Sequence, residues 1–172
     1  MLINDLLENN LNIPSGEIFA GILGGNPSQG ARSPHLWNYA FNAHGLSYVM
    51  YPMDVTSKNL QVLLEYLDDD KRFIGGAVAV PHKEMVASWL IERGNAYITS
   101  EARNIGAVNS LYRSKGGHIM GNNTDGEAAL LSLKELRTNF DGATVLVIGP
   151  GGAGKAVAAY IKKEINSGKL LL

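Results

Sequence analysis

Short apolar runs alternate along the chain with stretches in which apolar residues recur at helical spacing. Three of these runs predict strands at residues 17–24, 47–55 and 73–80. Each predicted strand precedes a predicted helix: residues 33–44 with Ser33 as N-cap, a helix capped by Ser57, and residues 83–93. This alternation is typical of an α/β protein with a mostly parallel sheet, and we expect helices on both faces of that sheet in three layers.

The pattern continues with smaller elements in the second half of the chain. We expect a short helix at 97–104, strands at 107–113 and 117–120, and a longer helix at 124–138. A polar turn at 139–142 precedes a strand at 145–149, a glycine-rich turn, a helix to residue 166 with Gly168 as C-cap, and another strand beginning at 169. The polar turn places a predicted domain boundary between residues 138 and 139.

Composition narrows the classes of function. The formal net charge is −1, which gives no electrostatic footprint for nucleic acid or for an anionic membrane surface. The chain has no cysteine, so disulfides and thiolate chemistry are excluded. No apolar run approaches the roughly 18 residues that span a bilayer, and the first residues lack the basic start of a secretory signal. We therefore expect a cytoplasmic protein that binds neither nucleic acid nor membrane.

The glycine-rich turn is the first candidate for chemistry. Gly149, Gly151 and Gly154 fit the GxGxxG spacing between an apolar strand and a helix, where dinucleotide pyrophosphates bind. A tight turn without a nucleotide is the alternative. A P-loop is disfavoured, because Ala156 stands where a hydroxyl would bind Mg²⁺. Residues 139–172 are therefore expected to be the first βα unit, and an incomplete start, of a Rossmann-type NAD(P)-binding domain.

Lys83 and Asp125 are the second candidate. Lys83 directly follows a predicted strand, and Asp125 lies at the start of a predicted helix. Open α/β sheets bind ligands outside the carboxyl ends of their strands, so both positions suit a cleft. A lysine beside a carboxylate can move a proton, while the carboxylate fixes the position and charge of the amine. From spacing alone, solvated surface charges remain the simpler interpretation.

Five segments together resemble the shikimate dehydrogenases in order and spacing. Residues 31–38 resemble the family's SxSPxxHN, 77–83 its NVTxPxK, 106–110 its GAVNT, 121–126 its GxNTDG, and 147–155 its GxGGAxR cofactor turn. The resemblance implies a substrate-binding catalytic domain over residues 1–138. It also implies reversible NADP-dependent conversion of 3-dehydroshikimate to shikimate, or to a close analogue. The ligand would be a hydroxylated ring carboxylate, and a homodimer is compatible with the sequence.

The resemblance also implies roles for individual residues. Lys83 would exchange the hydroxyl proton, and Asp125 would bind both the substrate hydroxyl and Lys83. The other implied site residues are Ser33, Arg32, Asn109 and Asn123 for the substrate, and Gly149, Gly151, Gly152, Ala153 and Gly154 for the cofactor. Residues that distinguish NADP from NAD are expected about 20 residues after the turn, beyond Leu172, so NAD stays open as the alternative.

Four positions depart from the family pattern: Ala31, Trp37, Ala77 and Ala79 replace a serine, a histidine, an asparagine and a threonine. Their lost hydrogen bonds favour weaker shikimate binding or a less polar ligand, and Arg32 is a candidate to compensate through a carboxylate. Because the cofactor domain has only begun at Leu172, we expect little dehydrogenase activity from the chain by itself. A non-catalytic module that binds small carboxylates is the alternative function.

Overall fold

The computed structural model describes residues 2–136, 138–149 and 151–172, and it contains two β-sheets. The larger sheet has strands β1 (Ile18–Gly24), β2 (Tyr48–Asp54), β3 (Phe73–Val78), β4 (Ser110–Arg113) and β5 (Ile119–Asn122), and the smaller has β6 (Thr144–Leu146) and β7 (Lys169–Leu171). The α-helices are α1 (Ser33–Ala43), α2 (Leu60–Asp69), α3 (Lys83–Arg93), α4 (Ser100–Ile105), α5 (Asp125–Leu136) and α6 (Gly152–Glu164). Short 3₁₀ helices are η1 (Ile3–Asp5), η2 (Pro27–Gln29) and η3 (Asn95–Tyr97).

The strands of the larger sheet lie in the order β2-β1-β3-β4-β5. Strand β1 pairs in parallel with β2 and with β3, whereas β4 is antiparallel to both of its neighbours. Four of the five strands therefore run in the same direction, and the predicted α/β fold with a mostly parallel sheet is confirmed. Strand β1, which lies between β2 and β3, is buried on both faces, which explains its nearly continuous apolar sequence.

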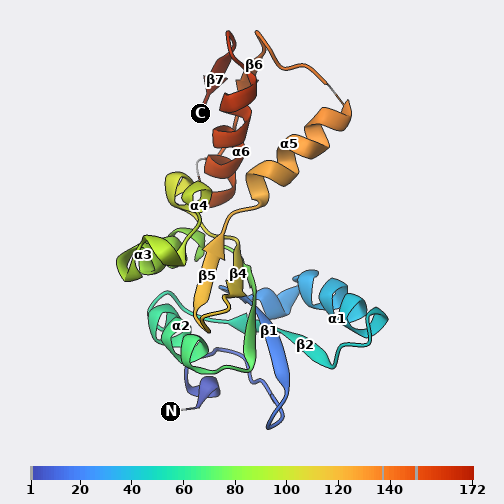
Figure 1. The fold of residues 1–172 in the computed structure, drawn as a ribbon, viewed down its shortest axis with the longest axis vertical. Helices are drawn as coiled ribbons and strands as arrows, with labels where there is room; N and C mark the ends of the chain where they lie inside the picture. The colour runs from blue at the N-terminus through green and yellow to red at the C-terminus, as the bar shows by residue number, and fades with distance from the viewer. Residues whose placement is uncertain (1, 137, 150) are drawn as a thin grey trace.

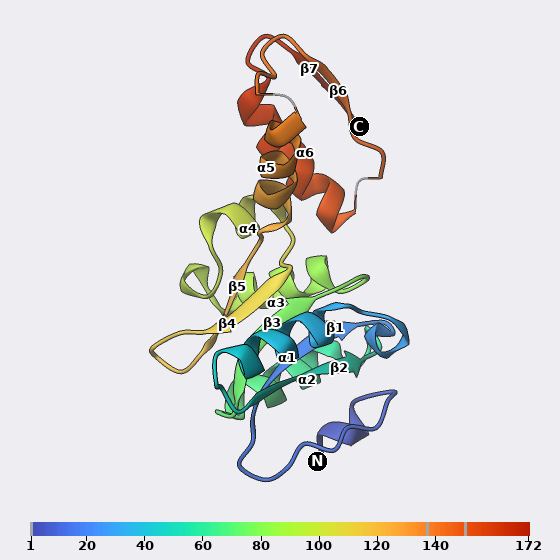
Figure 2. The ribbon, with the colours of Figure 1, turned by 90° about the vertical axis from the view of Figure 1, so that its right-hand side faces the viewer.

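Helices cover both faces of this sheet in three layers (Figures 1 and 2). On one face, Phe41 of α1 packs with Ala20 and Ile22 of β1. On the other face, Phe19 and Leu23 of β1 belong to the larger core cluster, which includes α2 and α3. Successive strand residues point to opposite faces, so the alternation along β1 builds both cores at once.

Several helix ends differ from the sequence-based predictions. Ser33 is the first residue of α1 rather than its N-cap, because Arg32 occupies the cap position. Similarly, Ser57 does not cap α2, which begins at Leu60 with Asn59 as the cap residue. The predicted C-cap at Gly168 was wrong as well, since α6 ends at Glu164 and Ile165 is its C-cap residue. The Ser33 correction matters for function, because the hydroxyl is not committed to capping the helix.

The predicted strand at 107–113 begins only at Ser110. Its first residues bond elsewhere: the Val108 N–H donates to the Lys83 carbonyl at 2.9 Å, outside the ladder with β3. This bond ties the segment before β4 to the first turn of α3. The predicted helix at 97–104 is also divided, because α4 starts after Thr99, whose hydroxyl accepts from the Ala102 N–H.

Helices α5 and α6 and strands β6 and β7 lie together at one end of the molecule (Figure 1). Strands β6 and β7 are parallel and are connected through α6, so this part forms a βαβ unit. Gly126 allows α5 and α6 to approach closely, because a Cβ there would collide with the Ala156 carbonyl. Ala156 of α6 also packs with Ile105 of α4 and with Ala107, which connects α6 to the part of the chain before β4. In the described parts of the chain, no helix is both long and apolar enough to cross a bilayer.

Candidate active site

Lys83 and Asp125 form an ion pair, with 2.6 Å between Lys83 Nζ and Asp125 Oδ2. Lys83 is the first residue of α3 and Asp125 is the first residue of α5. Their side chains are 16% and 25% exposed, so the pair is shielded but can still be reached by a small molecule. The structure thus brings together the two residues that the sequence proposed as partners, although they lie 42 positions apart.

Asn109 holds the second oxygen of the same carboxylate. Its side-chain Nδ2 donates to Asp125 Oδ1 at 2.7 Å and to Thr124 Oγ1 at 3.0 Å. In return, the Thr124 N–H donates to Asn109 Oδ1 at 2.9 Å. With one oxygen bound by an ammonium and the other by an amide, the Asp125 carboxylate has a fixed orientation. Sequence analysis did not single out Thr124 for a role, although it stands within the GxNTDG segment.

Asn123 fixes the start of α5 through two hydrogen bonds to the backbone. Its side chain is buried, with its Nδ2 donating to the Ala107 carbonyl at 2.9 Å. Its Oδ1 accepts the Asp125 N–H at 3.1 Å. Both polar ends of the amide are therefore used within the protein. Asn123 thus fixes the Asp125 backbone, and its burial keeps its side chain away from the surface.

The described residues of the glycine-rich turn leave space and free N–H groups for a phosphate. Gly149 adopts φ +98°, and a Cβ at Gly154 would collide with the Gly149 carbonyl. Apart from the adjoining residues of the chain, no atom of the described residues lies within 4 Å of where a Cβ at Gly149 or Gly151 would stand. Helix α6 begins at Gly152 without a side-chain cap from its N-cap Gly151, so its first N–H groups can bind phosphate. Together with Ala153, these residues fit a dinucleotide phosphate.

This turn lies directly beside the ion pair. A Cβ at Gly152 would stand 3.1 Å from the Lys83 Cβ, so the absence of a side chain at Gly152 lets the Lys83 side chain pack closely against the start of α6. One turn further along α6, Lys155 Nζ lies 2.9 Å from Glu84 Oε1 and links α6 to α3. The candidate proton-transfer residue and the candidate phosphate site therefore share one edge of the molecule.

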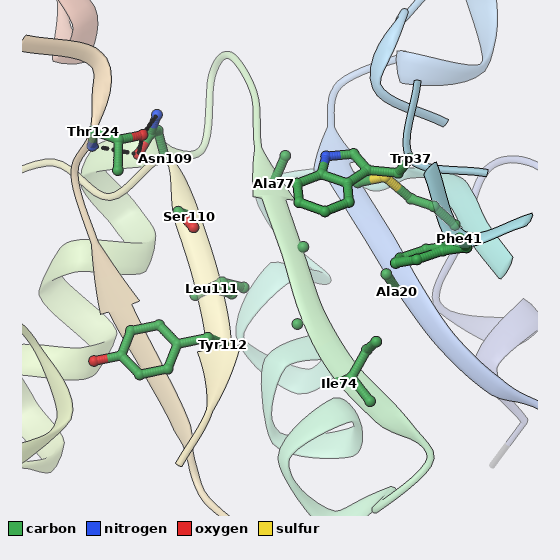
Figure 3. A pocket seen from close by; sticks show the side chains of 13 residues that line it. Ala20, Trp37, Phe41, Ile74, Ala77, Asn109, Ser110, Leu111, Tyr112 and Thr124 are labelled. Atoms are coloured by element: carbon green, nitrogen blue, oxygen red, sulfur yellow. Dashed lines mark hydrogen bonds between the residues drawn. The ribbon is translucent and has the colours of Figure 1, made fainter. Parts of the chain in front are cut away.

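A cavity of about 410 Å³ opens on the α1 face of the larger sheet. It is lined by Ala20, Trp37, Phe41, Met50, Ile74, Gly75, Gly76, Ala77, Asn109, Ser110, Leu111, Tyr112 and Thr124. Figure 3 shows Asn109 and Thr124 at one end, with Trp37 and Phe41 on the opposite side across Ala77. Because Asn109 and Thr124 line the cavity, and Asn109 binds Asp125, the ion pair stands at the edge of this space.

The remaining predicted substrate residues stand apart from that lining. Among the described residues, the set that lines the cavity does not include Arg32 or Ser33, which lie at the start of α1. Ala31 and Ala79 pack, with Ala77, against the apolar cluster beneath α1.

Residues 2–136, 138–149 and 151–172 hold no group of three histidine, aspartate or glutamate side chains placed to bind a metal.

The family model and the curated relatives that match this chain point to the same protein family. The family model described as "Shikimate dehydrogenase substrate binding domain" matches residues 23–111. Shikimate dehydrogenase (NADP(+)) of Carboxydothermus hydrogenoformans is 38% identical over 138 residues, covering 80% of this chain and 46% of the relative. The corresponding protein of Methanocaldococcus jannaschii is 34% identical, covering 83% of this chain and 48% of the relative. The chain thus spans about half the length of these curated relatives.

Solved structures of the same family have a similar fold. Shikimate dehydrogenase from Aquifex aeolicus superimposes with a TM-score of 0.78 at 30% identity, covering 92% of this chain and 56% of that one. The Thermus thermophilus enzyme, solved with NADP(H) and shikimate, gives a TM-score of 0.72 at 27% identity, covering 89% and 54%. Because the family model covers more than half of its residues, the chain belongs to the family of shikimate dehydrogenase substrate-binding domains.

Proposed function

We propose that this chain serves the reversible, NADP-dependent interconversion of 3-dehydroshikimate and shikimate, or of a closely similar ketone and alcohol. The observation that carries the proposal is the cluster of Lys83, Asp125 and Asn109, which stands between a cavity and a glycine-rich turn. A proton donor, a fixed carboxylate and a phosphate site on one edge are the parts that such a reaction requires. The names of the relatives support the same reaction.

Proton transfer is the step assigned to Lys83. In the direction of oxidation, the alcohol loses a hydride from carbon and a proton from oxygen, and the Lys83 amine accepts that proton. In the direction of reduction, the Lys83 ammonium returns a proton to the oxygen as the carbonyl carbon gains a hydride. Asp125 Oδ2 lies 2.6 Å from the Lys83 nitrogen and fixes its position. General acid–base catalysis of this kind is worth about 10²–10⁴-fold in rate.

The cofactor would be held by the backbone of Gly149 and of residues 151–154. The N–H groups at the start of α6 would bind its pyrophosphate, and NADP supplies or accepts the hydride when bound. The names of the relatives favour NADP over NAD. The contact between Gly152 and Lys83 supports a cofactor lying next to the proton-transfer residue.

Binding of the substrate carboxylate is assigned to the start of α1. Arg32 is exposed there, and the Ser33 hydroxyl does not cap the helix. A guanidinium and a hydroxyl can both donate to a carboxylate. This assignment places the charged group of the substrate at the α1 end and its reacting oxygen at Lys83.

The test is a hydride-transfer assay on the chain extended at Leu172 with the remaining sequence of the Carboxydothermus hydrogenoformans relative. We expect oxidation of shikimate or quinate, followed by the absorbance of NADPH. No oxidation of these acids or of their amino analogues would contradict the proposal. Calorimetry on the chain alone supplies the second arm. Binding of shikimate without binding of NADPH, combined with an inactive extended protein, would favour the non-catalytic module.

A further inference from the structure

The cavity beside the ion pair has two chemically different sides. Its polar side chains include Ser110 of β4, Asn109 directly before β4 and Thr124 just after β5. The opposite side is apolar, formed by alanine, isoleucine, methionine and aromatic side chains of β1, β2, β3 and α1: Ala20, Met50, Ile74, Ala77, Phe41 and Trp37. Figure 3 shows the Trp37 indole lying over Ala77.

The apolar side is continuous with the core beneath α1. Ala77 and Ile74 pack against the cluster of Ala20, Ile22, Phe41 and Met50. The Trp37 and Phe41 rings are 5.7 Å apart, and an edge-on contact at 5.6 Å connects Phe41 to Tyr48. The indole is nevertheless half exposed, at 53% for the residue, so its free surface is available to a ligand in the cavity.

The floor between the two sides offers little hydrogen bonding. It is formed by Gly75 and Gly76 of β3, whose backbones are paired with β1 on one side and β4 on the other. A Cβ at either glycine would collide with a neighbouring backbone carbonyl, so neither position accepts a side chain. The flat floor leaves room for a ring, while its N–H and C=O groups are largely used within the sheet.

Ligand hydroxyls would therefore have very different environments on the two sides. A hydroxyl near Asn109 and Thr124 meets donors and acceptors, whereas one facing Ala77 or Trp37 loses its water without gaining a partner. An unpaired buried hydroxyl costs enough free energy to reduce affinity about tenfold or more. A hydrocarbon edge placed there instead gains from leaving water.

We propose that the cavity takes the ring of a cyclic carboxylate, with a single ring hydroxyl or carbonyl directed toward Lys83 and a hydrocarbon edge packed on Ala77, Phe41 and Trp37, while the carboxylate lies outside the cavity toward the start of α1. This rests on the proposed function, and it narrows the substrate to a class less hydroxylated than shikimate. Ala77 and Trp37 are then the specificity-determining residues. The wall that they form sets how many hydroxyls the ring can carry.

The test compares two acids by calorimetry on the chain as it exists: 3-hydroxycyclohexanecarboxylate and shikimate. We expect the dissociation constant of shikimate to be at least about tenfold larger. Ala77→Asn places a polar amide in the wall and should lower this ratio to about one or below. Ala77→Ser is the smaller variant, and it should move the ratio in the same direction if the asparagine disturbs folding.

Ala96→Asn makes the same chemical change at an exposed position of η3 and should leave the ratio unchanged. Equal or tighter binding of shikimate by the unaltered chain would overturn the inference while leaving the proposed function in place. A ratio that neither Ala77 variant changes would also overturn it. If neither acid binds, the inference fails together with the proposed function.

Discussion

Asn109 and Lys83 approach the same carboxylate from opposite sides: the amide of Asn109 donates to one oxygen of Asp125 at 2.7 Å and the ammonium of Lys83 to the other at 2.6 Å. Neither oxygen can turn without breaking a charge-assisted bond. The position of the lysine nitrogen therefore depends on a residue that need not touch it.

Replacing Asn109 should impair catalysis more than folding. Asn109→Ala removes the bond that orients Asp125 together with the bonds to Thr124. We expect turnover of the extended protein to fall about 10–100-fold, because misplaced catalytic groups are costly, with a smaller change in the midpoint of urea unfolding. Asn95→Ala, at the exposed start of η3, is the matched control. An Asn109 variant with unaltered turnover would show that the orientation of Asp125 is unimportant.

Asp68 should make folding sensitive to acid. Its side chain is buried, which by itself raises its pKa, but the Ile119 N–H, Arg93 and His118 outweigh burial and hold the pKa below its usual value. A carboxyl whose pKa is lowered by folding contributes stability above its unfolded value near about 4, and that contribution is lost as the pH falls through the folded value.

Asp68→Asn should accordingly lower the free energy of unfolding at pH about 7. The variant should then lose less of that free energy than the unaltered chain as the pH falls from about 5 to 2. Breaking a buried ion pair of this kind costs about 3–5 kcal/mol. Urea unfolding at several pH values measures both effects, with the exposed Asp69→Asn as control. A variant that keeps the full acid sensitivity of the unaltered chain would assign that sensitivity to other carboxyls.

Tyr51 should ionise late in an alkaline titration. Burial and a hydrogen bond of 2.6 Å to Glu17 raise its pKa to about 12. The stability that it contributes is complete below pH about 10, the usual tyrosine value, and is lost as the pH rises toward 12. Ultraviolet titration should show one tyrosine fewer at high pH in Tyr51→Phe. If the Tyr51→Phe variant instead lacks a tyrosine that ionises near pH about 10, the raised pKa of Tyr51 is contradicted.

Gly126 should control the contact between α5 and α6. Gly126→Ala drives a methyl group into the Ala156 carbonyl and the Tyr160 ring, which costs about 1–3 kcal/mol. Hydrogen exchange should accelerate in α6 while β1 and β3 stay protected. Gly116→Ala, whose new methyl would meet only Ser114 Oγ at 3.6 Å, is the control and should leave exchange unchanged. Equal protection of α6 in both variants would rule out the close approach.

The sequence predicted the parts of this structure that depend on periodicity. Leu60, Leu63, Leu64 and Leu67 all lie in the core, as their helical spacing indicates. The pattern allowed an approach of Lys83 to Asp125, because one residue follows a strand end and the other begins a helix after a strand, but it was the family resemblance that implied the pair. Both positions then lie at the same edge of a sheet.

What the sequence did not predict depends on contacts between distant segments. The bond from the Val108 N–H to the Lys83 carbonyl takes Val108 out of the predicted strand, and no local pattern signals it. Likewise, the apolar wall of the cavity needs α1 to lie over β3, which places Trp37 against Ala77. The motif departures at these positions pointed to altered polarity, but the shared wall became visible only in three dimensions.

The measurement that tests the central claim most directly is the turnover of the extended protein after Lys83→Met, which keeps most of the length of the side chain and removes its charge. With Lys115→Met, at an exposed position, as control, we expect kcat to fall by about 100-fold or more, while the dissociation constant of the acid changes about threefold at most. If the Lys83 variant turns over as fast as the unaltered protein, the proton passes through another group and the proposed site is wrong.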